Sequence, residues 1–179
     1  MADHPQTMIS IATIEDSKDL ARLGSETFVE SFGHMYRESD LHAFLSENHS
    51  QDAYRKAINN PRSKIWIART KDGNAVGFAS AGPCHLPVPD QPPNAGELGR
   101  LYIRQSHQGF GLGVRLLEQA LEFLDATFEH IYLSVFSENL AAQRLYKRYH
   151  FEIFHEYHFM VGQHADEEYL MRRTRHTKK

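Results

Sequence analysis

The sequence predicts an α/β fold in which helices flank a mixed central sheet. Residues 64–70 form a short run rich in β-branched and aromatic residues, which is typical of a strand. Leu112, Leu116 and Leu117 recur instead at the spacing of one helix face. Segments of the two kinds alternate along the chain, as they do where helices pack on a sheet. The length of 179 residues suits a single domain, and we expect its core to span about residues 8–173.

The first half of the chain is expected to form three strands and two helical regions. One helix starts at Asp16 or Ser17, because either residue can cap its first turn. One or two shorter helices lie within residues 41–58, and Pro61 closes that region. Lys71-Asp72-Gly73-Asn74 is a typical hairpin turn. The strands of this half are expected at residues 8–14, 64–70 and 74–82.

The second half follows a proline-rich segment, residues 83–94, which predicts a surface loop and not a domain linker. A helix is expected to run to about Phe128, and another spans residues 138–149. The basic residues 174–179 are expected to fray. The strands of this half are expected at residues 97–104, 131–136, 151–160 and 168–173.

The segment Gln108-Gly-Phe-Gly-Leu-Gly113 joins a predicted strand to a predicted helix. Its glycines leave no β-carbon to keep a ligand from the backbone, and the first turn of a helix offers unpaired N–H groups to an anion. The spacing lacks the G-x-G-x-x-G pattern of a dinucleotide site and the lysine of a P-loop. The segment therefore predicts a site for the diphosphate of another phosphorylated cofactor. A glycine-rich turn before an ordinary amphipathic helix is the alternative.

Three motifs together resemble the GNAT family of N-acetyltransferases. Gln108-x-x-Gly111-x-Gly113 is similar to the family's [RQ]-x-x-G-x-[GA] loop for the pyrophosphate of acetyl-coenzyme A. Residues 97–103 resemble its fourth strand. Asn139 and the segment 145–151, Leu-Tyr-Lys-Arg-Tyr-His-Phe, resemble its last helix and signature. The motifs occur in the family's order, so the resemblance implies a GNAT-type acyltransferase fold.

The resemblance also implies acetyl-coenzyme A as the acetyl donor, with its pantetheine arm between two strands that separate. Gln108 stands where many members have arginine, so Arg104 or His107 is expected to supply a charge. His150 replaces the usual glycine after the last helix, at a turn where histidine tolerates positive φ better than most residues. The residues expected to contact the donor are Leu101, Tyr102, Ile103, Gln108, Gly109, Phe110, Gly111, Leu112, Gly113, Val114, Asn139 and Ala142.

Two residues are candidates for the acid–base chemistry of acetyl transfer. Glu97 matches the position of a glutamate that many members keep on the fourth strand, and we expect it to act as general base, directly or through water. Tyr146 matches the tyrosine that the family places near the coenzyme sulfur, and we expect it to act as general acid. The alternatives are a solvated residue at a strand edge for Glu97 and a core aromatic for Tyr146.

The segment Glu26-Thr-Phe28 with Phe32 is similar to a segment of bacterial spermidine/spermine N-acetyltransferases. This resemblance implies a small polyamine-like primary amine as acceptor, attacking the thioester directly in a ternary complex. Glu26, Phe28, Glu30 and Phe32 are the candidates for binding it. The alternative is that the carboxylates are solvated, and the spacing of Phe28, Phe32 and Tyr36 favours core packing over an acceptor site.

Three other functions remain open at this stage. They are acetylation of a peptide or protein amino group, a non-catalytic coenzyme A-binding regulator, and a mononucleotide-binding protein that uses the same glycine loop.

Composition and charge limit the expected binding partners and cellular location of the protein. The net charge of −3 and the pI near 6.4 do not indicate binding to nucleic acid or to an anionic membrane. Cys84 is the sole cysteine, no apolar run approaches the length of a membrane span, and a cytoplasmic protein is expected. The twelve histidines are scattered without metal-ligand spacing, so no metal site is expected. A homodimer is expected by analogy with the family alone.

Overall fold

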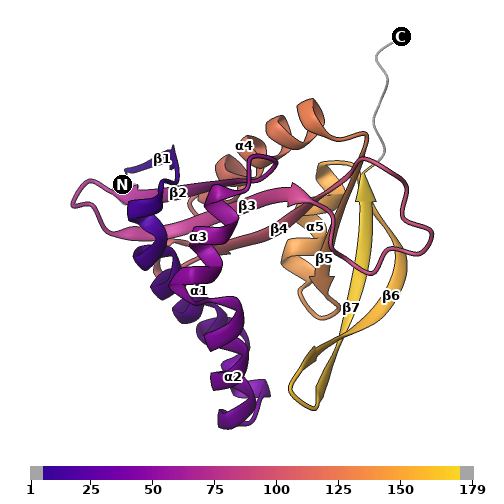
Figure 1. Ribbon diagram of the computed structural model, residues 1–179, viewed down its shortest axis with the longest axis horizontal. Coiled ribbons are helices and arrows are strands. Elements are labelled where there is room, and N and C mark those ends of the chain that lie inside the picture. The colour runs from indigo at the N-terminus through magenta and orange to yellow at the C-terminus, as the bar shows by residue number, and fades with distance from the viewer. Residues whose placement is uncertain (1–5, 174–179) are drawn as a thin grey trace.

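The computed structural model describes residues 6–173, so the expected fraying of residues 174–179 lies outside the described part of the chain. Seven strands form one sheet in the order β1-β2-β3-β4-β5-β7-β6, with helices on both faces (Figure 1). Only the β4–β5 pair is parallel among these neighbours. The strands are β1 (Thr7–Ile11), β2 (Lys64–Thr70), β3 (Ala75–Pro83), β4 (Ala95–Ile103), β5 (His130–Phe136), β6 (Phe151–Val161) and β7 (His164–Arg173). The helices are α1 (Ser17–Phe32), α2 (Glu38–Asn48), α3 (Gln51–Asn59), α4 (Leu112–Thr127) and α5 (Leu140–Arg148).

These elements confirm the predicted α/β class and the predicted order. The first strand is shorter than expected, because the chain turns into a short 3-10 helix at Ile14–Asp16 before α1. The region 41–58 divides into two helices at Ser50, whose hydroxyl accepts a hydrogen bond from the backbone N–H of Ala53 at 3.1 Å and so caps α3. Within residues 6–173, no helix is long and apolar enough to cross a bilayer.

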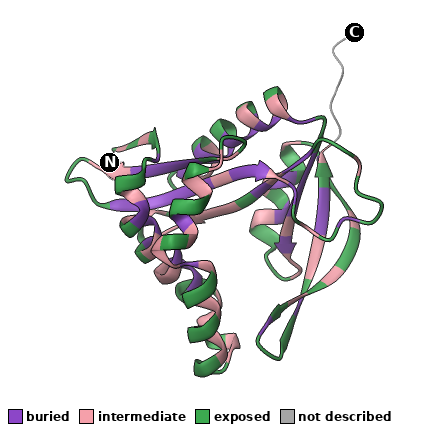
Figure 2. Cartoon of the chain, in the orientation of Figure 1, coloured by how far each residue is buried: buried purple, intermediate pink, exposed green. Residues whose placement is uncertain are grey.

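The sheet separates two apolar layers. Side chains alternate between its faces, so Ile65 and Ile67 of β2 pack with α1 and α3 while Trp66 and Ala68 pack with α4. Figure 2 accordingly shows buried residues along the central strands and exposed residues on the outer sides of the helices. The strands between these layers are held rigidly, which fixes the edges that border the functional site.

β4 and β5 stay together only over part of their length. Residues 95–98 of β4 pair with residues 130–133 of β5, and beyond Leu98 no pairing between the two strands remains. The β3–β4 register shifts at this point, with Leu98 opposite Ala81 and Arg100 opposite Ser80, so Gly99 is the extra residue of a bulge. A bulge bends its strand, which accounts for the departure of β4 from β5. β5 instead continues along β7 as far as Phe136.

Candidate functional site

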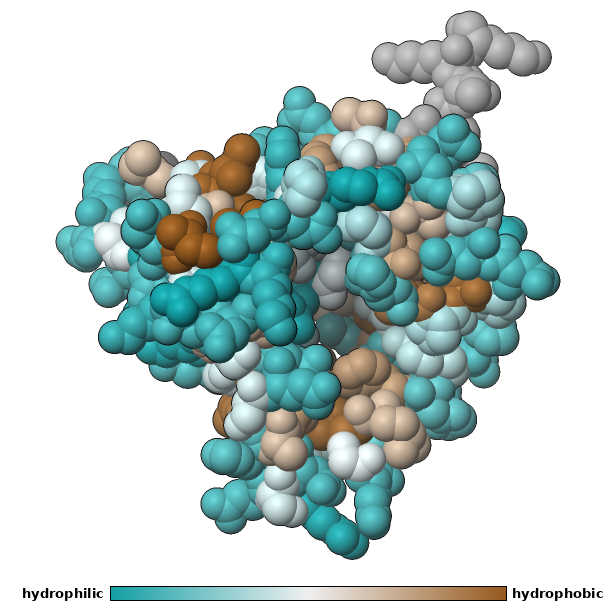
Figure 3. All heavy atoms as spheres, in the orientation of Figure 1, coloured by the Kyte–Doolittle hydropathy of each residue, from teal (hydrophilic) through white to brown (hydrophobic). Residues whose placement is uncertain are grey.

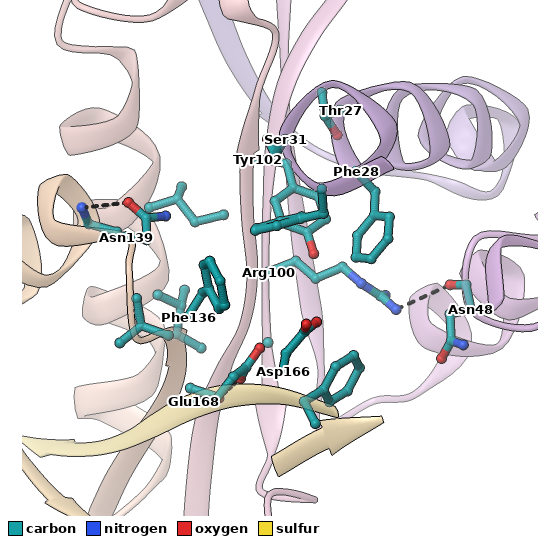
Figure 4. A pocket seen from close by; sticks show the side chains of 18 of the residues that line it. Thr27, Phe28, Ser31, Asn48, Arg100, Tyr102, Phe136, Asn139, Asp166 and Glu168 are labelled. Atoms are coloured by element: carbon teal, nitrogen blue, oxygen red, sulfur yellow. Dashed lines mark hydrogen bonds between the residues drawn. The ribbon is translucent and has the colours of Figure 1, made fainter. Parts of the chain in front are cut away.

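A cleft of about 740 Å³ opens where β4 and β5 separate. Its walls come from α1 and α2 on one side, from β5, α5 and the β6–β7 hairpin on the other, and from β4 between them. The hollow is visible near the centre of the molecule in Figure 3, with apolar residues gathered along its lower rim. Figure 4 shows side chains from these separate elements converging on one space.

Of the glycine loop, Gln108 lines this cleft, whereas Phe110 and Leu112 line a second pocket; the residues between Gln108 and α4 do not line the cleft. Gly109 and Gly111 have φ values of +84° and +78°, which disfavour any residue with a side chain, and Gly111 is the N-cap residue of α4. No side chain of residues 6–173 caps the helix, and the N–H groups of residues 112–114 have no partner within it. A β-carbon at Gly109 or Gly111 would meet no atom of the described chain within 4 Å. The open, positive end of a 16-residue helix fits the diphosphate of acetyl-coenzyme A.

The side chains expected to add charge to this loop have other partners. The guanidinium of Arg104 forms an ion pair with Glu26 of α1 and donates to the carbonyl of Ala75. The amide nitrogen of Gln108 donates to the carbonyl of Ile103 at 3.0 Å and thereby fixes the start of the loop. His107 shares a hydrogen bond with Ser106 at 2.9 Å. The loop therefore offers an anion mainly backbone N–H groups.

The free part of β4 supplies the floor of the cleft. Leu101, Tyr102 and Ile103 line it, together with Asn139 and Ala142 at the start of α5. Because this edge of β4 has no β5 partner, its backbone groups can pair with an extended ligand as they would with an added strand. The side-chain oxygen of Asn139 accepts from the N–H of Ala142 at 3.1 Å, so the asparagine serves as helix cap while it borders the cleft.

Glu97 lies beside the point where the strands separate. Its Oε2 accepts hydrogen bonds from the backbone N–H groups of His85 and Leu86, at 2.8 and 3.1 Å, and so anchors the loop that follows β3. Its Oε1 lies toward Gly99, 3.7 Å from the place a β-carbon there would occupy. The carboxylate is thus half-buried and held by the backbone, in contrast to a solvated side chain at a strand edge.

Tyr146 lies in α5 with its ring packed on Phe151, at 6.0 Å between ring centroids, and it lines the cleft. Burial raises the pKa of its hydroxyl, with a smaller contribution from Tyr102. Among residues 6–173 no hydrogen-bond partner of this hydroxyl is found. The core position and the cleft position expected for Tyr146 are therefore compatible. After this helix, His150 adopts a φ of +66°, so histidine does occupy the turn in place of glycine.

The acceptor candidates from α1 divide into two groups. Phe28 and Phe32 line the cleft, whereas Glu26 and Glu30 do not. Glu26 pairs with Arg104, and Glu30 accepts from the backbone N–H of Gln105 at 3.1 Å, because both carboxylates lie on the side of α1 that faces the loop after β4. These two residues fasten α1 to that loop.

Phe28, Phe32 and Tyr36 were expected to pack in the core more than to bind the acceptor. All three line the cleft. Phe28 stacks on Tyr36 at 5.9 Å and contacts Phe44 of α2 at 4.7 Å. Phe44 in turn meets Phe159 of β6 at 5.8 Å. All four residues line the cleft, so one set of rings both packs the end of α1 and forms an apolar wall.

Two carboxylates of β7 line the cleft that were not predicted from the sequence. Asp166 and Glu168 line the cleft, as Figure 4 shows. The hydroxyl of Tyr36 donates to Asp166 Oδ2, and the hydroxyls of Ser134 and Tyr157 donate to Glu168 Oε2. Burial raises the pKa of Glu168, and the nearby Asp166 adds to the rise while the hydroxyl donors oppose it. The sequence shows only that these residues share a strand face with the apolar Leu170, because their place in the cleft depends on elements far away in the chain.

Comparison with known proteins agrees with this geometry. The model of the Acetyltransferase (GNAT) family matches residues 26–151, and the chain belongs to that family. An uncharacterized N-acetyltransferase of Lactobacillus delbrueckii subsp. lactis is 26% identical over 160 residues, which cover 89% of this chain and 92% of the relative. The chain is thus an N-acetyltransferase, and its acetyl donor is acetyl-coenzyme A.

Two further similarities concern the fold and the acceptor. The crystal structure of the PaiA N-acetyltransferase of Thermoplasma acidophilum in complex with coenzyme A superposes with a TM-score of 0.73 at 19% identity, covering 95% of this chain and 99% of that one. The spermine/spermidine N(1)-acetyltransferase of Bacillus subtilis is 36% identical over 85 residues, 45% of this chain and 55% of the relative. Among the described residues no group of three or more His, Cys, Asp or Glu side chains could hold a metal ion.

Proposed function

We propose that this enzyme transfers the acetyl group to a primary amine of a small, polyamine-like molecule by direct attack within a ternary complex. The observation that carries the proposal is the charge of the cleft. Its lining holds the carboxylates of Glu97, Asp166 and Glu168 against the single guanidinium of Arg100. Carboxylates in a concave, partly apolar site attract a cationic ligand and orient it. The partial similarity to the Bacillus subtilis spermine/spermidine acetyltransferase supports the same acceptor class.

Glu97 is proposed to receive the proton of the amine. An alkylamine, with a pKa of about 10.4, arrives protonated and must lose a proton to react, and Glu97 can receive this proton directly or through a water molecule. Oε2 is occupied by two backbone donors, while Oε1 lies toward the bulge at Gly99. The second oxygen is therefore the one that would take the proton.

Tyr146 is proposed to stabilise the departing thiolate. The pKa of its hydroxyl is raised above the ordinary value of 10.0, whereas a thiol has a pKa of about 8.5, so full proton transfer from tyrosine to sulfur is unfavourable. A hydrogen bond from the hydroxyl to the developing anion carries no such penalty. The lack of another partner for this hydroxyl among residues 6–173 leaves it available for that bond.

Direct attack is favoured over an acyl-enzyme on cysteine. Cys84 is buried directly after β3, beside the residues that Glu97 anchors, and does not line the cleft. Burial, reinforced by the charge of Glu97, raises the pKa of its thiol to about 12. A thiol in this state is a weak nucleophile at neutral pH, because the thiolate is the reactive form.

The test is release of free thiol from acetyl-coenzyme A in the presence of a panel of acceptors: polyamines, diamines, monoamines and short peptides with free N-termini. We expect turnover with the small amines and little with the peptides. Preference for the peptides would instead support acetylation of protein amino groups. Tight binding of acetyl-coenzyme A without turnover on any acceptor would indicate a coenzyme A-binding regulator and contradict the proposed function.

A further inference from the structure

Asp166 carries an unusual buried oxygen. The residue is only 4% exposed, yet its Oδ1 accepts no hydrogen bond from the described residues. Nε2 of His164 lies 3.1 Å away but without the alignment of a hydrogen bond. Oδ2 is held by the hydroxyl of Tyr36, which fixes the carboxylate in the cleft wall (Figure 4). A buried polar atom without a donor destabilises a fold, so such an atom in a cleft points to a ligand that supplies the donor.

Glu168 lies on the same face of β7, two residues further along. Its two hydrogen-bond donors, the hydroxyls of Ser134 and Tyr157, both bond Oε2. Since Asp166 and Glu168 share a strand face and both line the cleft, they form a paired acidic wall. Two carboxylates held this close repel each other unless a cation lies between or beside them.

No lysine or arginine side chain of the described residues forms an ion pair with either carboxylate from across the cleft. Arg100 is directed elsewhere, since its guanidinium donates to the carbonyl of Asn48 at 3.1 Å and lies over the ring of Tyr54. Among residues 6–173, neither Asp166 nor Glu168 forms an ion pair with an arginine or a lysine. Phe159 of β6 pairs with Asp166 across the hairpin, and its ring contacts that of Phe44 of α2, so two aromatic rings of the cleft lining adjoin the acidic wall. Aromatic faces beside carboxylates suit an alkylammonium chain, whose methylenes pack on rings while its charge meets an oxygen.

We propose that Asp166 and Glu168 form a subsite for a second ammonium group of the acceptor, distinct from the amine that is acetylated. This subsite would make the enzyme prefer diamines and polyamines to monoamines of equal chain length. The inference rests on the proposed function in that it assumes an amine acceptor in this cleft. The inference adds to the proposed function that Asp166 and Glu168 select the acceptor by its second ammonium group.

The test compares putrescine with butylamine, which differ in the second amino group. Binding of each amine to the coenzyme A complex is measured calorimetrically for the wild type, Asp166→Asn and Glu168→Gln. Both substitutions keep the shape and an acceptor oxygen for the neighbouring hydroxyls. Glu167→Gln is the matched control, because Glu167 lies between the two residues on the same strand but is exposed and does not line the cleft. Thermal melting verifies folding, and Glu168→Gln carries the comparison if Asp166→Asn does not fold.

We expect Asp166→Asn and Glu168→Gln each to weaken putrescine binding by about 10- to 100-fold, as for loss of a hydrogen bond between charged groups, with little effect on butylamine. Glu167→Gln leaves both amines unaffected. Equal loss for the two amines, or no loss for putrescine, would overturn the subsite. Failure of the proposed function is a separate result: Asp166-dependent putrescine binding without acetylation would retain the subsite and remove the reaction. Acetylation of putrescine with an unchanged preference for putrescine over butylamine in both variants would retain the reaction and remove the subsite.

Discussion

Gly111→Ala tests whether the backbone of the glycine loop holds the acetyl donor. Gly111 has a φ of +78° as N-cap of α4, and a β-carbon there would meet open space on the described chain. Alanine at such a φ costs about 1–2 kcal/mol in backbone strain. For a chain of 179 residues, this corresponds to a melting temperature lower by roughly 2–8 °C.

The effect on donor binding is expected to exceed this strain. Each N–H group that bonds a charged phosphate oxygen contributes about 1.5–3 kcal/mol, so the loss of one such bond raises the Kd for coenzyme A by about 10- to 150-fold. The β-carbon of alanine would occupy the space from which the diphosphate approaches residues 112–114. Isothermal titration with coenzyme A measures the affinity, and calorimetric melting of the same samples measures the strain.

Gly73→Ala is the matched control. Gly73 lies in the β2–β3 turn with a φ of +84°, and a β-carbon there also meets nothing within 4 Å. This variant is expected to lose similar stability and to bind coenzyme A as the wild type does. The reasoning would be refuted if Gly111→Ala bound coenzyme A with wild-type affinity, or if Gly73→Ala weakened binding equally.

The remaining predictions concern catalysis and stability. Tyr146→Phe should lower kcat about 100-fold with little change in coenzyme A affinity or melting temperature, and a kcat near the wild-type value in steady-state assays would remove the tyrosine from the mechanism. Glu97→Gln keeps an acceptor for the N–H groups of the loop after β3, so it should fold but lose about 100- to 10,000-fold in kcat/KM. A kcat/KM near the wild-type value would exclude Glu97 as the base. Burial, aided by the charge of Arg100, lowers the pKa of His49 from 6.5 to about 3, so the unfolded chain binds a proton that the folded chain does not. Stability should therefore fall as the pH drops from 6.5 toward 3, by at most about 1.4 kcal/mol per pH unit from this group, and urea unfolding of His49→Asn should show a shallower loss.

The sequence predicted those parts of the site that local pattern controls. A glycine loop between a strand and an amphipathic helix needs only neighbouring residues to be recognised, and Gly109 and Gly111 do adopt positive φ. The turn at His150 is local in the same sense. The backbone conformation at these positions could therefore be anticipated.

The acceptor end could not be anticipated, because it depends on long-range placement. Nothing local to α1 shows that Glu26 and Glu30 turn toward Arg104 and the loop after β4. Asp166 becomes a candidate only in the folded chain, where it is buried and accepts a hydrogen bond from Tyr36, 130 residues earlier. An acidic pair on an apparently amphipathic strand looks solvated until the partner face is known.

The most direct test of the account is a titration of the isotope-labelled enzyme with coenzyme A, followed through its backbone amide resonances. We expect the largest shifts at residues 111–114 and along the free edge of β4 at residues 101–103, with slower amide exchange at both places in the complex. Unchanged resonances at the start of α4, with the main shifts on the opposite face of the sheet near α3, would contradict the assignment of this cleft to the acetyl donor.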